Sequence, residues 1–400
     1  MKLRDEAKKA IWIGLVCAVA YCTVYISRDI LGALTPQLTA DGIFDSAQLG
    51  TLSSLFFITY AVGQLINGII GDKIRGKYMV SLGLILASGC LFILPSLVQV
   101  PYAPYVAYAT MGFFLAMVYA PMTKMIAENM EPMLATRCNV AHSMGSYLGA
   151  PIAGWLATYL VWKPAFRVSS GILFALGVIF FLSFTVFEKK GMVKYGQFQR
   201  KKEEGGSIKV LLKRQIAKWT VISMLTGVVR TAILFWLMQY ITDHLHFAEK
   251  EAGNWYALGT SVIAVNSFLA VFIYQRLKEN LDRTIFLFFG VAALCFLGVY
   301  FVSQPQVNLI LLVLAMIFSN CASSIMWSRY CPSLRDTGMV SSATGFLDFC
   351  SYMAAAISTK LFAGAVETIG WSNLILVWFG LMCCGILVAI PWHKLQKTKV

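Results

Sequence analysis

The chain consists mainly of long apolar stretches, each near the length of about 20 residues that an α-helix needs to cross a bilayer. Only 13% of its 400 residues are charged and the mean hydropathy is +0.70, values far from those of a soluble globular protein. The pattern predicts an all-α polytopic membrane protein with twelve transmembrane helices. The predicted spans are 10–38, 49–70, 78–98, 102–126, 139–162, 168–187, 219–242, 254–274, 284–302, 307–327, 339–366 and 371–392.

The basic residues are distributed unevenly between the loops. Of 33 Lys and Arg residues, 26 lie at the two termini and in every second loop, whereas the alternate loops hold only Lys163, Arg167 and Lys250. By the positive-inside rule, both termini are expected in the cytoplasm. The net charge of +14 is therefore a topology signal, and no nucleic-acid partner is expected. We expect a monomer in the plasma or inner cell membrane, surrounded by the lipid bilayer.

Two arginines suggest that the chain contains two similar halves. Arg28 and Arg230 lie 202 positions apart, and each is followed 13 positions later by an aspartate, Asp41 or Asp243. We predict an N-terminal six-helix half (1–187), a cytoplasmic linker with ten basic residues (188–218) and a C-terminal six-helix half (219–400). The halves are expected to be pseudo-symmetric.

No pattern in the chain indicates an enzyme. The ten cysteines are scattered, mostly within spans, without the Cys or His spacing that a metal site needs. A phosphate-binding loop of the GxxxxGK[ST] type is also missing from the sequence, so ATP is not expected to drive a reaction. We therefore expect no catalytic residue, no metal and no cofactor.

Arg28 and Arg230 each lie within an apolar span. A charged side chain is costly at this depth, so it indicates a functional site. The planar guanidinium suits the oxygens of a phosphate. An internal pair, such as Arg28 with Asp348 or Arg230 with Asp29, is the alternative, and the two interpretations coexist if substrate displaces the internal partner. In the empty state the arginines are expected to lack counterions and to repel each other, so a bound anion would favour closure and exchange would be obligatory.

The segment GIIGDKIRGK at 68–77 resembles the loop signature of the major facilitator superfamily, G-x-x-x-D-[RK]-x-x-[GP]-[RK]. The resemblance implies two six-helix halves with a substrate site between them, and a gating role for Gly68, Asp72, Lys73 and Lys77. The matching segment of the second half, 272–283, lacks the aspartate.

Within the superfamily, the chain is similar to the organophosphate:phosphate antiporter family. The similarity rests on Y-x-x-x-Y-x-x-R at 21–28, Tyr60, CNVAHSMG at 138–145, VVRTAILFW at 228–236 and SSATGFLDFCSY at 341–352. It implies that Arg28 and Arg230 bind a phosphate in a central cavity, with His142, Tyr21, Tyr25 and Tyr60 nearby. Tyr21, Tyr25 and Arg28 are spaced to share one helix face.

The chain departs from the glycerol-phosphate carriers at several positions. Asp29 and Gln64 replace lysines, Lys124 is a further candidate cation, and Asp348 adds an acid. Lys124 precedes Glu128 by one helical turn, so it forms either a salt bridge or part of the cavity. His142 is either a hydrogen-bonded packing residue or a substrate or proton ligand. Lys360 is expected to extend to the outer membrane interface.

These features predict a secondary active transporter that exchanges a phosphorylated metabolite, such as a sugar phosphate or glycerol phosphate, for inorganic phosphate by alternating access. One alternative is a proton-coupled organic-anion symporter in which Asp29, Asp348 or His142 carries the proton. A second alternative is a transporter-like membrane sensor of sugar phosphate.

Overall fold

A computed structural model of the chain describes residues 2–71, 74–130, 132–195, 208–333 and 340–390. These residues form helices and no strand, as the apolar stretches predict. Their contacts divide the chain into two compact units. Unit 1 comprises Met1–Lys202, Leu237–Thr242 and Phe247–Ser261, and unit 2 comprises Glu203–Trp236, Asp243–His246 and Val262–Val400. The division at a linker over 188–218 stays a prediction.

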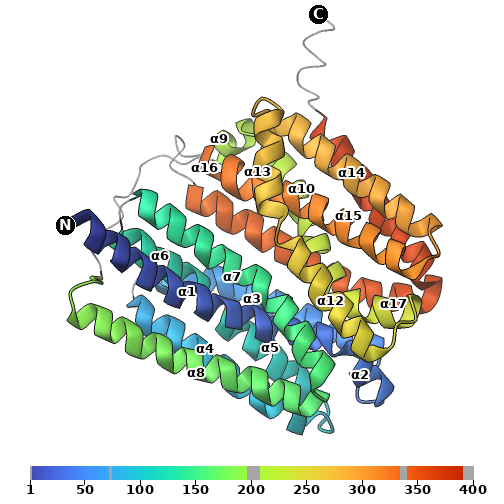
Figure 1. Ribbon diagram of the computed structural model, residues 1–400, viewed down its shortest axis with the longest axis horizontal. Coiled ribbons are helices and arrows are strands. Elements are labelled where there is room, and N and C mark those ends of the chain that lie inside the picture. The colour runs from blue at the N-terminus through green and yellow to red at the C-terminus, as the bar shows by residue number, and fades with distance from the viewer. Residues whose placement is uncertain (1, 72–73, 131, 196–207, 334–339, 391–400) are drawn as a thin grey trace, which may run out of the picture. The chain divides into compact units, whose positions relative to one another are not determined.

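The first part of the chain forms eight helices, all in unit 1 (Figure 1). They are α1, Lys2–Ala33; α2, Thr35–Ala40; α3, Ser46–Gly71; α4, Gly76–Leu97; α5, Ala103–Leu115; α6, Tyr119–Asn129; α7, Pro132–Tyr159; and α8, Trp162–Lys189.

The later part of the chain alternates α-helices with three short π-helical segments, η1 to η3. The elements are α9, Ile208–Lys213; α10, Ile216–Gly227; η1, Val228–Ile233; α11, Leu234–Gln239; η2, Tyr240–His244; α12, Glu249–Ile263; α13, Asn266–Arg276; α14, Leu281–Phe301; α15, Pro305–Ile325; η3, Met326–Tyr330; α16, Cys331–Ser333; and α17, Val340–Ala389. A π turn holds one residue more than an α turn and is frequent at functional sites.

Ten helical stretches of the described chain are long and apolar enough to cross a membrane. The last, Ala343–Ala389, covers most of the eleventh and the twelfth predicted spans, which are separated by a non-helical residue, Gly370 (φ 73°, ψ 170°). Glycine tolerates this positive φ because it has no Cβ. The fifth predicted span lies in α7, outside the ten. The predicted polytopic α-helical architecture is confirmed.

The fourth predicted span, 102–126, is not one continuous helix. α5 ends at Leu115 and α6 begins at Tyr119, with a turn over 116–118. Pro121 explains the break, because proline has no N–H to donate and its ring clashes with the carbonyl four residues earlier, that of Met117. Irregular backbone inside a membrane is tolerated where protein or a cavity surrounds it.

Small residues bring α1 and α7 close together in unit 1. A Cβ on Gly149 would lie 2.7 Å from the carbonyl carbon of Tyr25, and a Cβ on Gly145 would lie 3.3 Å from the carbonyl carbon of Ala18. Such small residues let helix backbones approach closely in a membrane. α4 packs against α8, and α3 packs against α5 (Figure 1). Tyr25 is thereby held in place beside Arg28.

Unit 2 is held together by α17 and its neighbours. α17 packs against α10 and α14, and α14 also packs against α15. A Cβ on Gly227 would lie 2.5 Å from the Ser351 carbonyl oxygen, so α10 and α17 cross with almost no space between their backbones. Lys218 Nζ donates to Asp282 Oδ1 at 2.8 Å and to the Ala389 carbonyl at 3.1 Å. The close crossing of α10 and α17 places Ser351 next to η1, the segment that carries Arg230.

Candidate functional site

Arg28 is buried in unit 1 with an acidic and an aromatic partner. Its Nε lies 3.4 Å from Asp29 Oδ1, and the two side chains are 3% and 9% exposed. Its Cζ lies 4.7 Å from the ring centre of Tyr25 and 5.2 Å from that of Phe57, at distances typical of cation–π contacts. Tyr108 on α5 donates its hydroxyl to the Arg28 carbonyl oxygen at 3.1 Å. The helix around Arg28 is thus anchored to α5.

The predicted tyrosines of α1 lie beside the arginine. The rings of Tyr21 and Tyr25 meet edge to face with centres 5.1 Å apart, and Tyr21 also contacts Tyr119 of α6 at 5.6 Å. Tyr21, Tyr25 and Arg28 therefore share one region of α1, as their spacing predicts. Tyr119 follows the break in the fourth span, which places the start of α6 at this cluster.

Tyr60 and Gln64 lie one helical turn apart on α3. Tyr60 is buried and stacks on Phe56, with ring centres 5.9 Å apart and an interplanar angle of 15°. Phe56 in turn contacts Tyr108 at 5.0 Å, which connects Tyr60 to the aromatic side chains near Arg28. Gln64 is half-buried.

Arg230 of unit 2 has an environment of the same kind. Its Nη2 lies 3.9 Å from Asp348 Oδ1, with both side chains 26% exposed, and its Cζ lies 5.5 Å from the Tyr352 ring centre. The Ser351 hydroxyl lies 3.5 Å from Nη2. Asp348, Ser351 and Tyr352 all come from α17, whereas Arg230 comes from the π-helical segment η1. The expectation that the empty arginines lack counterions is wrong, because an aspartate lies beside each.

For the remaining predicted cavity residues, the structure gives the helix and, where the side chain is described, its burial. Lys124 is half-buried on α6, one turn before Glu128. His142 belongs to α7, and its side chain lies outside the described part of the structure. Lys360 is exposed on α17, and its expected position at the outer membrane interface stays a prediction. The roles of Lys124 and His142 therefore stay predictions.

The predicted gating loop is only partly described. Asp72 and Lys73 lie outside the described residues, and of Gly68 only the position at the end of α3 is known. Lys77 is buried and donates to Glu188 Oε2, while Arg75 donates to Glu188 Oε1 at 3.0 Å. Glu188, near the end of α8, thus joins the start of α4 to the start of the predicted linker.

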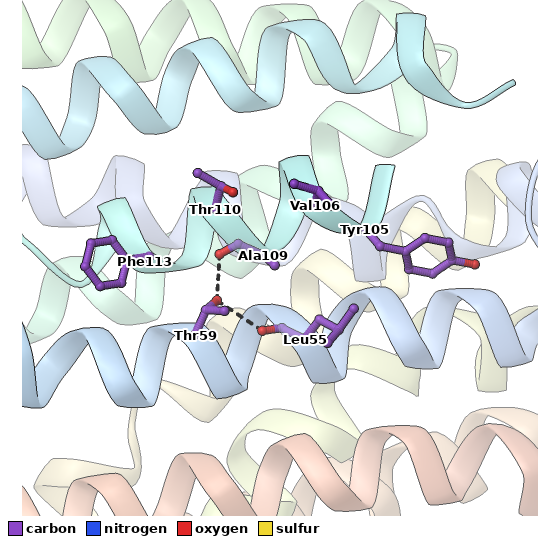
Figure 2. A pocket seen from close by; sticks show the side chains of 7 residues that line it. All are labelled: Leu55, Thr59, Tyr105, Val106, Ala109, Thr110 and Phe113. Atoms are coloured by element: carbon purple, nitrogen blue, oxygen red, sulfur yellow. Dashed lines mark hydrogen bonds between the residues drawn. The ribbon is translucent and has the colours of Figure 1, made fainter. Parts of the chain in front are cut away.

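A pocket of about 450 Å³ opens between α3 and α5, and Figure 2 shows its walls. The Thr59 hydroxyl donates to the Ala109 carbonyl at 2.6 Å and to the Leu55 carbonyl at 3.0 Å, so it is not directed toward a ligand. No predicted site residue lines this pocket. It is lined by Leu55, Thr59, Tyr105, Val106, Ala109, Thr110 and Phe113. Its apolar walls suit a hydrocarbon chain better than an anion.

Sequence reasoning missed several partners of the predicted residues. Phe57, Tyr108, Tyr352 and Glu188 each contact a predicted cation from a different helix or turn. Aromatic residues are common throughout the chain, so neither their type nor their spacing singles out these three. Glu188 could have been identified from the sequence as a partner of basic residues, because it is an acid at the start of a strongly basic segment.

The model of one protein family matches residues 17–359, which is most of the chain. The chain belongs to the Major Facilitator Superfamily. Among solved structures of similar fold are a bacterial homologue of the human lysosomal transporter Spinster (TM-score 0.70, 13% identity, 95% of this chain and 93% of that one) and a D-xylose–proton symporter (TM-score 0.69, 11% identity, 95% and 96%). The multi-pass membrane fold predicted from the sequence is confirmed.

Curated relatives narrow the similarity within the Major Facilitator Superfamily. The membrane sensor protein UhpC of Escherichia coli is 21% identical over 97% of this chain and 92% of its own length. Sugar phosphate exchanger 3 of Mus musculus is 22% identical over 86% and 79%, and a probable hexose phosphate transport protein of Chlamydia pneumoniae is 19% identical over 95% and 90%. These relatives support the resemblance to the organophosphate:phosphate antiporter family.

Proposed function

We propose that this superfamily member is a secondary active transporter that carries a phosphorylated small metabolite, a sugar phosphate or glycerol phosphate, in exchange for inorganic phosphate. Arg28 and Arg230 would each bind the phosphate group as the protein alternates between its two open states. The relatives named for sugar phosphate or hexose phosphate support this substrate class.

One observation carries the proposal: an arginine lies inside an apolar helix of each unit, held by an aspartate and an aromatic ring. Arg28 contacts the Tyr25 and Phe57 rings, and Arg230 contacts the Tyr352 ring. Such charges are costly in a membrane and are retained where they bind a substrate or ion. A phosphate offers several oxygens and up to two negative charges, which makes it a stronger partner for a guanidinium than one carboxylate.

Phosphate counterflow tests the proposal directly. Proteoliposomes loaded with inorganic phosphate are expected to take up labelled phosphate, and Arg28→Lys and Arg230→Lys are each expected to abolish that uptake. Lysine keeps the charge but loses the planar set of donors that guanidinium presents to a phosphate. The uptake is then repeated with external hexose 6-phosphate and glycerol 3-phosphate as competitors to identify the organic group.

Arg167→Lys is the matched control, because Arg167 is an exposed arginine on α8, outside the predicted site and gating residues. Its counterflow is expected to equal that of the unchanged chain. Absence of counterflow in the unchanged chain would exclude phosphate antiport. Equal loss of counterflow in all three variants would show a general sensitivity to the loss of arginine and would remove the support for a specific role of Arg28 and Arg230.

A second function has its own support, because the membrane sensor protein UhpC matches nearly the whole chain. A sensor would bind sugar phosphate and signal without transporting it. Saturable binding of hexose 6-phosphate to the purified protein together with no flux in proteoliposomes would establish this function. Flux at a rate comparable to that of ligand release would exclude it.

The proposal also includes the topology predicted from the basic residues. Both termini would lie in the cytoplasm of a cell with this protein in its plasma or inner membrane, and one chain would suffice for transport. Fusion of a fluorescent reporter that folds only in the cytoplasm to each terminus tests the orientation. Fluorescence from neither fusion would overturn it.

A further inference from the structure

Asp29 is a buried carboxyl group whose two oxygens have different surroundings. Oδ1 lies 3.4 Å from Arg28 Nε. Oδ2 is buried and has no hydrogen-bond partner among the described residues. Buried carboxylate oxygens are normally hydrogen-bonded, because leaving such an acceptor unpaired costs free energy. The unpaired oxygen is therefore the position at which a proton would be best accommodated.

Among the side chains that the structure describes, titratable groups that interact with Asp29 come from three helices. Arg28 lies beside it on α1, and the phenols of Tyr108 on α5 and Tyr256 on α12 interact electrostatically with it. Both tyrosines are buried, and phenols are neutral at physiological pH. Arg28 is thus the positively charged group beside the Asp29 carboxyl.

Binding of an anion changes this balance of charge. A phosphate dianion at Arg28 would compete with Asp29 for the same guanidinium and bring two negative charges close to the carboxylate. Two acidic groups that share a buried site cannot both stay fully ionised, because low dielectric strengthens their repulsion. Protonation of one of the two acidic groups removes this repulsion.

We propose that Asp29 takes up a proton on Oδ2 when Arg28 binds the substrate anion, so that anion binding is coupled to proton uptake. The proton comes from the aqueous solvent, the new bond is O–H at Oδ2, and no electrons are transferred. The inference rests on the proposed function, since it assumes that Arg28 binds the substrate.

The second arginine provides a comparison inside the same protein. Asp348 is 26% exposed and lies 3.9 Å from Arg230. Water reaches this carboxylate, so it can remain ionised when an anion engages Arg230. Asp29, at 9% exposed, has no such access. The structure therefore assigns proton uptake to Asp29 and only a counterion role to Asp348.

The test measures ligand binding and proton uptake together on the purified full-length protein. Glycerol 3-phosphate or hexose 6-phosphate is titrated at about pH 8 in weak buffer containing a pH indicator, where a phosphate ester with a second pKa of about 6 is already a dianion. We expect uptake of about one proton per ligand bound, and an affinity that falls about tenfold for each pH unit above 7, as linkage requires.

Asp29→Asn is expected to retain binding but to lose both the proton uptake and the pH dependence of affinity. The surface variant Asp45→Asn is expected to keep both, because Asp45 is exposed and lies outside the proposed site. If Asp29→Asn does not fold, Asp29→Glu preserves the carboxyl group and should preserve proton uptake. Proton uptake by the unchanged chain tests the proposal even if neither Asp29 variant folds.

The outcomes separate this inference from the function on which it rests. Binding of the phosphate ester by the unchanged chain without proton uptake and with a flat pH profile would overturn the role of Asp29 and leave the transporter proposal standing. Proton uptake that persists in Asp29→Asn would also overturn it. Absence of ligand binding at every pH would overturn both proposals.

Discussion

Gly149 on α7 lies directly against Tyr25 on α1, so that a Cβ at position 149 would be 2.7 Å from the Tyr25 carbonyl carbon and 2.8 Å from the Ile26 nitrogen. These are backbone atoms, which cannot move aside as the end of a flexible side chain can. The same stretch of α1 continues to Arg28, three residues after Tyr25. Helix packing and the position of a buried charge are therefore linked at this crossing.

Gly149→Ala is expected to destabilise the protein by about 1–3 kcal/mol, the usual cost of overpacking. It should also weaken phosphate binding, because Tyr25 and Arg28 lie next to each other. Thermal unfolding in detergent and a binding titration measure the two effects. Gly171→Ala on α8 is the matched control, since an added Cβ there meets nothing within 4 Å. Equal unfolding temperatures for the two variants would contradict the packing argument.

Tyr25→Phe is expected to bind phosphate with nearly unchanged affinity, because the ring beneath Arg28 is kept. Tyr25→Leu removes the ring, and the loss of a desolvated cation–π contact worth about 2 kcal/mol should weaken binding about 30-fold. Isothermal titration with inorganic phosphate compares the two variants. A larger loss in Tyr25→Phe would show that the hydroxyl group, and not the ring, contributes to binding.

Glu188→Gln is expected to lower the unfolding free energy by about 1.5–3 kcal/mol, the range for hydrogen bonds to charged groups. It leaves the buried Lys77 ammonium without its carboxylate, whereas the exposed Arg75 loses little. Lys77→Met in the Glu188→Gln background should recover part of the loss by removing the unpaired charge. A double-mutant cycle from thermal unfolding measures this coupling. Additive losses would show that Lys77 and Glu188 do not stabilise each other.

The thiol of Cys331 on α16 provides a pH-dependent reporter of folding. Burial raises its pKa to about 11, while a hydrogen bond with Thr344 acts in the opposite direction. The reactive thiolate is therefore rare at pH 7, and alkylation by N-ethylmaleimide should accelerate about tenfold per pH unit up to that pKa. Peptide mapping by mass spectrometry follows the reaction at this cysteine. Alkylation of the native protein at pH 7 as fast as in denaturing detergent would contradict the buried position.

The lengths of the apolar stretches were sufficient to predict the membrane fold, because each span must satisfy its backbone hydrogen bonds as a helix. They did not predict the break at 116–118, although Pro121 is visible in the sequence, because the effect of a proline in a helix depends on its neighbours. Nor did they predict the π-helical segments in the seventh span. Such turns depend on packing and have no composition signal.

The spacing of Tyr21, Tyr25 and Arg28 correctly predicted one local cluster, since neighbours on a single helix follow from its geometry. Partners on other helices could not be found this way. Arg28 pairs with the adjacent Asp29, and Arg230 pairs with Asp348, whereas sequence reasoning suggested the crossed pairs. The pairing of carboxylates with guanidiniums depends on the direction in which each side chain points. The order of charged residues in the sequence does not give this direction.

The π-helical segments also affect how the internal repeat should be interpreted. Arg28 and Asp41 are 13 positions apart, as are Arg230 and Asp243, but only the second interval crosses η1 and η2. Each π turn holds an additional residue, and one residue corresponds to about 100° of rotation around an α-helix. The first interval is instead interrupted at Leu34, between α1 and α2, so the two equal intervals in sequence do not correspond to equal rotations about one helix axis.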